Sequence, residues 1–510
     1  MNTWLTGPSR WWGGAAAWLC VTALAFTALP TPALAGPDES GKASDKSAEP
    51  APVVTEHTIA LPGGTLEYTA SAGRLPLLDE QGKTKANVFH VAYRLKGGDA
   101  SRPITFVFNG GPGSSSVWLH MGALGPRRVV FGPEGEALPP PAQLADNDAT
   151  WLAFTDLVFI DPVTTGYSRA AEGEDPKQFH GLRGDARAVA EFIRLFTTRE
   201  QRWLSPKYLA GESYGTTRAA ALAPILQGEL GMYLSGIIFI SPVLEFQTLD
   251  FDAGNDDPYW LFLPTYTATA WKHGKLGADL GGLEQAVRAA EAWSQTEYLT
   301  ALAKGQRMTD AERTAAELSL AKFTGLSSDF IRRSNLRISQ GRFCKELLRD
   351  RGQTVGRLDS RYTGADRDDA GGGPEYDASY AVIQGPFTAA LNAYVRGELK
   401  YESDLNYEIL TGKVHPWDMD APARYPEVAD GLRSAMNQNP ALRVMVCNGY
   451  FDLATPHFAS DRTFSHLGLR TDEDRARVRT ERFEAGHMFY LRQADLSKLR
   501  RVAGEFVSGK

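Results

Sequence analysis

The sequence contains few cysteines. Only three occur among 510 residues, and Cys20 lies in the N-terminal segment. Secreted domains that depend on disulfides carry many more, so this chain is not a disulfide-dependent scaffold. The other two, Cys344 and Cys447, are able to form at most one bridge. Their positions do not show whether they meet, so one disulfide and two free thiols both stay open.

A long basic block is also absent. The formal net charge is −7 and the pI is about 5.8. Because phosphate binding needs clustered Lys and Arg, we expect no nucleic-acid partner. His, Cys and carboxylate residues do not gather at metal-ligand spacing, so neither a metal nor another cofactor is indicated.

One acidic stretch resembles a calcium loop. Asp366, Asp368 and Asp369 precede three glycines, but Ala370 and Asp377 occupy the fifth and twelfth positions, where the loop needs other residues. We therefore favour a solvated acidic loop.

Long apolar runs are missing beyond the first 35 residues. Arg10 precedes an apolar run over residues 15–29, and residues 33–35 (ALA) fit a signal-peptidase site. The run is shorter than the roughly 20 residues that span a bilayer, which disfavours a membrane anchor. Lipidation at Cys20 is disfavoured by the bulky Leu19 before it. We expect a signal peptide over residues 1–35, export to the periplasm or the medium, and no stable membrane association after cleavage.

The remaining chain has an ordinary globular composition, with 43% hydrophobic and 23% charged residues, which excludes a fibrous or wholly disordered protein. Residues 36–52 are small, polar and proline-containing and predict a flexible leader. Residues 53–245 and 401–510 predict the two parts of an α/β core. Residues 246–400 predict a mainly helical insertion between them.

Short apolar runs carry the α/β prediction. They are bounded by Gly, Pro, Asn or Asp, as are strands that are covered on both faces of a parallel sheet. Between two of them, Val189, Phe192, Ile193 and Phe196 recur at helical spacing. Alternating strands and helices predict an α/β fold with helices on both faces of a mostly parallel sheet. The predicted strands are Ile104–Phe108, Asp156–Ile160, Tyr208–Ala210, Gly236–Ile240 and Leu442–Cys447.

The insertion has helical patterns and few convincing strands. Leu283, Val287 and Ala290 fit one helix face, and Thr309 is a suitable N-cap for a second helix. An insertion of this kind over an α/β sheet often acts as a lid.

Residues 211–215 (GESYG) form a G-x-S-x-G pattern between a strand-like segment and a helix-forming one. In a sharp strand-to-helix turn, the two glycines leave room for a strained serine whose hydroxyl projects from the sheet edge. This context favours Ser213 as a nucleophile over an ordinary turn serine. A serine nucleophile needs a base, and the base needs an orienting carboxylate.

In α/β-hydrolases the chain order of the triad is Ser, then Asp or Glu, then His. Asp452 and His487 follow Ser213 in that order. Asp452 comes after a predicted strand, and His487 lies near the C-terminus in residues 485–488 (AGHM). His457 is the main rival for the base because it lies near Asp452 in the sequence. We favour His487, since a base on the loop after the last strand is able to reach the nucleophile across the sheet edge.

Residues 109–113 (NGGPG) directly follow the strand that begins at Ile104. A glycine run at the end of a strand exposes backbone N–H groups, as an oxyanion hole requires. The alternative, a phosphate loop, lacks the G-K-[ST] ending.

With these motifs the sequence resembles the serine carboxypeptidase family, which has the α/β-hydrolase fold. The resemblance covers about residues 56–507 and rests on residues 109–113, 159–168 (FIDPVTTGYS) and 211–215, together with the Asp452 and His487 segments. It implies release of C-terminal residues from peptides with a free C-terminus. The residues that it implies are Ser213, His487 and Asp452 as triad, the N–H groups of Gly111 and Tyr214 as oxyanion hole, and Asn109 and Glu212 as the carboxylate-binding pair.

The carboxylate-binding pair has a chemical consequence. Glu212 beside a substrate carboxylate must be protonated to donate a hydrogen bond, because close like charges raise one pKa. We therefore expect peptidase activity to be favoured at acidic pH.

Two positions depart from the family. Ala123 stands where Glu is usual, so a second acid in this network is absent, and Ser114 replaces a Cys, so the disulfide made there is missing. These changes indicate a divergent, bacterial branch. An esterase or acyltransferase with the same triad stays open, and a catalytically silent binding protein is less favoured because nucleophile and base are both present. Monomer and homodimer stay open.

Overall fold

The computed structural model describes residues 49–421 and 424–509. The predicted signal peptide (1–35) and most of the predicted leader (36–52) lie outside the described residues. None of the helices within the described ranges combines the length and the apolar character that crossing a bilayer requires.

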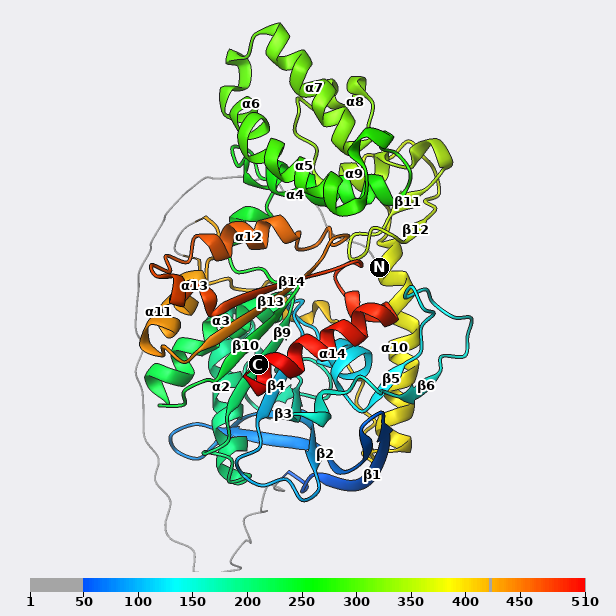
Figure 1. Cartoon of the computed structure of the whole chain (residues 1–510). Coiled ribbons are helices and arrows are strands. Elements are labelled where there is room, and N and C mark those ends of the chain that lie inside the picture. Colours follow the sequence, from blue (N-terminus) through cyan, green and yellow to red (C-terminus); the bar gives the residue numbers. More distant parts are fainter. Residues whose placement is uncertain (1–48, 422–423, 510) are drawn as a thin grey trace, which may run out of the picture. The chain divides into compact units, whose positions relative to one another are not determined.

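A single large sheet forms the centre of residues 49–509 (Figure 1). Its order is β1-β2-β3-β7-β4-β9-β10-β13-β14, with β8 paired to β3. The half from β7 to β14 is parallel, and β1, β2 and β3 add antiparallel strands at one edge. The strands are β1 Val53–Leu61, β2 Gly64–Leu78, β3 Thr84–Leu95, β4 Ile104–Phe108, β7 Asp156–Ile160, β8 Arg169–Ala170, β9 Lys207–Glu212, β10 Gly236–Ile240, β13 Arg443–Gly449 and β14 Val478–Phe483.

The five predicted strands are confirmed as β4, β7, β9, β10 and β13, which are buried along nearly their whole length. Sequence reasoning did not name β1, β2, β3 or β14. In β1, buried or half-buried residues alternate with exposed ones, which is the pattern of a strand with one solvated face.

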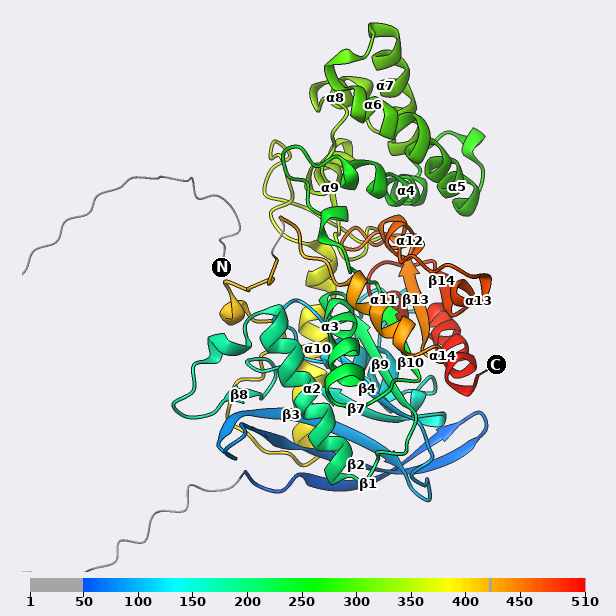
Figure 2. The same cartoon turned by 90° about the vertical axis from the view of Figure 1, so that its left-hand side faces the viewer.

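Helices cover both faces of the sheet (Figure 2). Side chains alternate across a strand, so Phe106 and Phe108 pack into the cluster under α2 (Leu182–Arg199), α3 (Tyr214–Pro224) and α11 (Ala429–Gln438). Val107 packs into the opposite cluster with α10 (Ala378–Gly397) and α14 (Gln493–Ser508). The predicted helix face over residues 189–196 is the buried face of α2.

Residues 257–355 form most of a third hydrophobic cluster. Thr309 caps α7 as predicted: its Oγ1 accepts from Glu312 N at 3.2 Å, and the Glu312 carboxylate accepts from Thr309 N at 2.9 Å. Among the long helices between residues 246 and 400, α10 alone packs against the sheet, and the others pack in this third cluster. The helices of the third cluster are α4 Asp257–Lys272, α5 Leu283–Trp293, α6 Leu299–Lys304, α7 Asp310–Thr324, α8 Ser328–Arg333 and α9 Gln340–Glu346.

The remaining short elements connect these layers. They are α1 Val117–Leu119, β5 Arg127–Val129, β6 Leu144–Asp146, β11 Thr354–Val355, β12 Thr363–Gly364, α12 His457–Ser465 and α13 Asp472–Ala476.

Cys344 and Cys447 are both buried and free.

In the acidic stretch, Asp368 and Asp369 are exposed as expected, but the prediction of a solvated loop was wrong for Asp366. Its carboxylate is buried and accepts from Lys345 Nζ at 2.6 Å, because a buried lysine needs an opposite charge close by.

Candidate active site

Ser213 stands at the turn between β9 and α3, with φ 59° and ψ −132°. Such a positive φ is rare for a non-glycine residue. The turn is tight enough to require both flanking glycines. A Cβ on Gly211 would lie 2.4 Å from the carbonyl oxygen of Gly215, and a Cβ on Gly215 would lie 2.8 Å from that of Phe108. The G-x-S-x-G pattern therefore forms the strained strand-to-helix turn that the sequence predicts.

His487 and Asp452 lie on the loops that follow the adjacent strands β14 and β13. His487 Nδ1 is 2.7 Å from Asp452 Oδ2. The Asp452 carboxylate is fully buried and also accepts from the backbone N–H groups of Ala454 and Thr455 and from Thr455 Oγ1. The carboxylate is thus surrounded by donors and directed at the imidazole.

Burial on its own would lower the pKa of His487, but the charge and hydrogen bond of Asp452 outweigh it, so the pKa is raised above its usual value. A buried imidazole whose Nδ1 is hydrogen-bonded to a carboxyl group keeps Nε2 available to exchange a proton.

Two short contacts join this pair to the serine turn. Ser213 N donates to the carbonyl of Ile240 at 3.0 Å, and the next residue, Ser241, donates from Oγ to the carbonyl of His487 at 2.7 Å. Thr455 Oγ1, which donates to Asp452, also lies 3.0 Å from the Ser241 carbonyl oxygen. The carboxyl ends of β9, β10, β13 and β14 thereby bring the three predicted triad residues to one edge of the sheet.

The rival base His457 lies elsewhere. Its Nε2 is 3.1 Å from a carboxylate oxygen of Glu291, and its Nδ1 is 3.3 Å from Thr265 Oγ1. Both partners belong to helices of the third cluster. His457 is therefore a buried contact between α12 and these helices, and the structure pairs Asp452 with His487.

The glycine loop after β4 is pressed against the start of α3. A Cβ on Gly110 would lie only 2.4 Å from the backbone nitrogen of Tyr214. Gly111 follows with φ +99°, a value that L side chains rarely adopt. The backbone of this loop and the N–H of Tyr214 are thus close together, as the predicted oxyanion hole of Gly111 and Tyr214 requires.

Asn109 and Glu212, the predicted carboxylate-binding residues, are both buried beside this loop. Asn109 Oδ1 accepts from Leu119 N at 3.1 Å, so its Nδ2 points the other way. Nδ2 is buried and completes no well-aligned hydrogen bond within the described residues, although it lies near enough to Glu212 to lower the pKa of that carboxyl. A buried donor without an acceptor is costly, and a ligand oxygen would satisfy it.

The pKa of Glu212 is raised well above that of an ordinary carboxyl group. Burial raises its pKa to about 7, although the positive charge of His487 and contacts from Tyr490 and Asn109 act in the opposite direction. Tyr490 donates from its hydroxyl to Glu212 Oε2 at 2.6 Å. At acidic pH the carboxyl is therefore protonated and able to donate a hydrogen bond.

The two departures from the family pattern are both buried. Ala123 lies in a π-turn, η1 (His120–Leu124), and its carbonyl accepts from Asn147 Nδ2 at 2.8 Å. Ser114 Oγ accepts from Trp118 Nε1 at 2.8 Å. At position 114, where the family has a cysteine, this chain thus has a serine that accepts a hydrogen bond.

Residues 357–359 of the insertion hydrogen-bond to the loops that carry Asp452 and His487. This contact was not predicted from the sequence. His487 N donates to the Leu358 carbonyl at 2.6 Å, Leu453 N donates to the Arg357 carbonyl at 3.0 Å, and Gly486 N donates to Asp359 Oδ2 at 3.0 Å. These partners are separated by 90 residues or more in the sequence, so no local pattern signals them.

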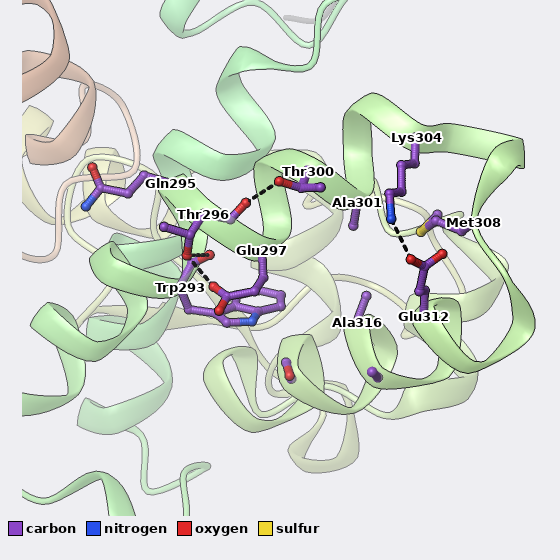
Figure 3. A pocket seen from close by; sticks show the side chains of 12 residues that line it. Trp293, Gln295, Thr296, Glu297, Thr300, Ala301, Lys304, Met308, Glu312 and Ala316 are labelled. Carbon is purple, nitrogen blue, oxygen red and sulfur yellow. Dashed lines mark hydrogen bonds and ion pairs between the residues drawn. The ribbon is translucent and has the colours of Figure 1, made fainter.

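A cavity of about 670 Å³ opens in the third cluster, between η7 (Ser294–Tyr298), α6 and α7. Figure 3 shows Trp293, Lys304 and Glu312 on its walls. None of the predicted site residues lines it.

Known proteins resemble this chain in sequence. Residues 64–247 match the model of a family described as serine carboxypeptidase. The pheromone-processing carboxypeptidase KEX1 of Puccinia graminis f. sp. tritici is 34% identical over 121 residues, or 22% of this chain and 16% of that protein. Serine carboxypeptidase-like 51 of Arabidopsis thaliana is 29% identical over 165 residues, or 29% of this chain and 32% of that protein. The chain thus spans less than a third of either relative's length.

Among solved structures, KEX1(Δ)p, a prohormone-processing carboxypeptidase from Saccharomyces cerevisiae, matches with a TM-score of 0.54 and 16% identity, covering 86% of this chain and 91% of the other. At this identity the likeness concerns the fold. With the parallel sheet and the strained turn at Ser213, it defines an α/β-hydrolase fold. Within that class, residues 64–247 carry the serine carboxypeptidase pattern, so the family resemblance predicted from the sequence is confirmed. A bacterial origin stays a prediction.

Proposed function

We propose that this chain is a serine carboxypeptidase that removes residues one at a time from the C-terminus of peptides. The family match over residues 64–247 supports the peptidase class. The buried Nδ2 of Asn109, which completes no well-aligned hydrogen bond and lies beside a Glu212 with a pKa of about 7, carries the finer proposal.

The reaction is an acyl transfer. Ser213 Oγ attacks the carbonyl carbon of the last peptide bond while His487 Nε2 takes the hydroxyl proton. The N–H groups of Gly111 and Tyr214 stabilise the oxyanion. The C–N bond then breaks as His487 returns the proton to the leaving amino acid. Water hydrolyses the acyl-enzyme by the same route, with Asp452 holding the imidazole throughout.

Recognition of the C-terminus follows from the neighbouring polar groups. Asn109 Nδ2 and the protonated carboxyl of Glu212 each donate a hydrogen bond to the terminal carboxylate. Hydrogen bonds to a charged acceptor are stronger than those to a neutral one. An amidated C-terminus lacks that charge, and an internal peptide bond places more chain where these donors lie. The pair therefore selects the last residue.

The test is a set of peptides, each prepared with a free and an amidated C-terminus. Products are read by mass spectrometry at several pH values between about 5 and 8, with Ser213→Ala as control. Loss of single residues from the free peptides alone, absent in the control, is the expected result. Cleavage of simple esters by Ser213 without trimming of any peptide would instead indicate the esterase or acyltransferase alternative.

Export is part of the same proposal and is supported by the pattern of residues 1–35. Its test is N-terminal sequencing of the exported protein, which should begin near Gly36. A mature protein that still starts at Met1 would contradict it.

A further inference from the structure

Tyr490 makes a contact that the predicted mechanism does not include. It lies in η11 (Phe489–Leu491), three residues after His487. Its hydroxyl donates to Glu212 Oε2 at 2.6 Å, and both side chains are buried. Burial raises the pKa of Tyr490 well above its usual value, so the phenol keeps its proton at every working pH. Tyr490 is therefore a permanent donor to Glu212.

The ring of Tyr490 is fixed by close packing. A Cβ on Gly122 would lie 2.7 Å from Cε2 of the ring, so the backbone beside Ala123 approaches it directly. Phe489 also packs against this ring, edge to face, at a centroid distance of 5.9 Å. The hydroxyl thus has a defined position, and the Glu212 side chain takes its orientation from that contact.

This contact decides which oxygen of Glu212 carries the acid proton. A protonated carboxyl accepts most readily on its carbonyl oxygen and donates from the other. Because Tyr490 donates to Oε2, the proton belongs on Oε1. Oε1–H is then the group that meets a substrate carboxylate. The other groups that act on Glu212 are His487, Asp452 and Asn109.

We propose that Tyr490 is a positioning residue that orients Glu212 and directs its proton to Oε1 for recognition of the terminal carboxylate. This inference rests on the proposed carboxypeptidase function. It also assigns a hydrogen-bonding partner to Glu212 next to position 123, where this chain has Ala and no second acid.

The test is Tyr490→Phe, which keeps the ring against Gly122 and removes only the hydroxyl. For free-acid peptides at about pH 5, KM should rise about tenfold, the equivalent of one hydrogen bond to an acid, while kcat stays within about threefold. Hydrolysis of a neutral ester should be unchanged. Tyr298→Phe is the matched control, because Tyr298 is equally buried and donates to the Leu336 carbonyl at 2.6 Å away from the site.

A second readout does not depend on activity. The carboxyl stretch of Glu212, assigned by its loss in Glu212→Gln, is titrated by infrared difference spectroscopy. The hydrogen bond from Tyr490 lowers the pKa of Glu212, so its removal should move the midpoint upward by about one pH unit.

The two readouts separate the two proposals. If wild-type protein cleaves free and amidated peptides at the same rate, the carboxypeptidase proposal fails. The infrared midpoint still measures the effect of Tyr490 on the pKa of Glu212. An unchanged midpoint in Tyr490→Phe, or an equal loss of peptide and ester hydrolysis, would overturn the role of Tyr490.

Discussion

Asp452→Asn perturbs the proposed acid–base pair with the least change of shape. The Oδ1 atom of Asp452 accepts from Ala454 N at 2.8 Å and from Thr455 N at 3.0 Å. An asparagine must keep its oxygen at that position, because an NH₂ group would face two donors. Its NH₂ group then replaces Oδ2 and faces His487 Nδ1.

The consequence is a change of tautomer. With a donor opposite Nδ1, His487 carries its proton on Nε2 and is unable to take the proton of Ser213. The same change in a Ser-His-Asp enzyme lowers kcat by about 10,000-fold, or about 5.4 kcal/mol of transition-state stabilisation. We expect a loss of that size for peptides and esters alike, since both share the acyl transfer.

The assay measures kcat on a free-acid peptide and on a neutral ester, with thermal unfolding as a check on folding. Asp461→Asn is the matched control, because the Asp461 carboxylate pairs with Arg482 at a partly exposed position. The control should keep kcat within about twofold. A folded Asp452→Asn variant that retains more than about a tenth of the wild-type kcat would refute the assignment.

The remaining predictions concern substrate binding and the rival histidine. Above about pH 7 the wild-type KM for free-acid peptides should rise about tenfold per pH unit, because the protonated fraction of Glu212 falls at that rate. In Glu212→Gln, KM should be flat with pH, and an unchanged rise would show that another group titrates. Asn109→Ala should raise KM for free-acid peptides about 10- to 100-fold while ester hydrolysis is retained, as expected for one hydrogen bond to a charged group. Loss of both activities would indicate a structural role. His457→Gln should alter kcat by less than about threefold, since its partners are Glu291 and Thr265. A loss comparable to that of Asp452→Asn would reopen the choice of base.

Much of the fold was predictable because the central strands are buried on both faces. Apolar runs such as Ile104–Phe108 and Gly236–Ile240 signal such strands directly, and the structure has them with the same bounds. The antiparallel strands β1 and β2 were missed because exposed or half-buried residues interrupt their buried positions, so neither forms a continuous apolar run. The turn at Ser213 was predictable because two glycines at fixed spacing have a local steric cause.

Contacts between distant segments explain what was missed at the site. Thr455 holds both Asp452 and His487, and Tyr490 reaches Glu212 across 278 residues of sequence. The Leu358 carbonyl accepts from His487 N through the arrangement of the insertion. Periodicity and motif spacing describe neighbours along the chain, so they do not signal such partners.

Covalent labelling with a fluorophosphonate tests the central claim most directly, because the probe reacts with an activated serine. Folded protein is incubated with the probe, digested and mapped by mass spectrometry. We expect one adduct, on the peptide that contains Ser213, which is absent in Ser213→Ala and strongly reduced in His487→Ala. Folded wild-type protein that stays unlabelled, or that is labelled at another serine, would contradict acyl transfer through Ser213.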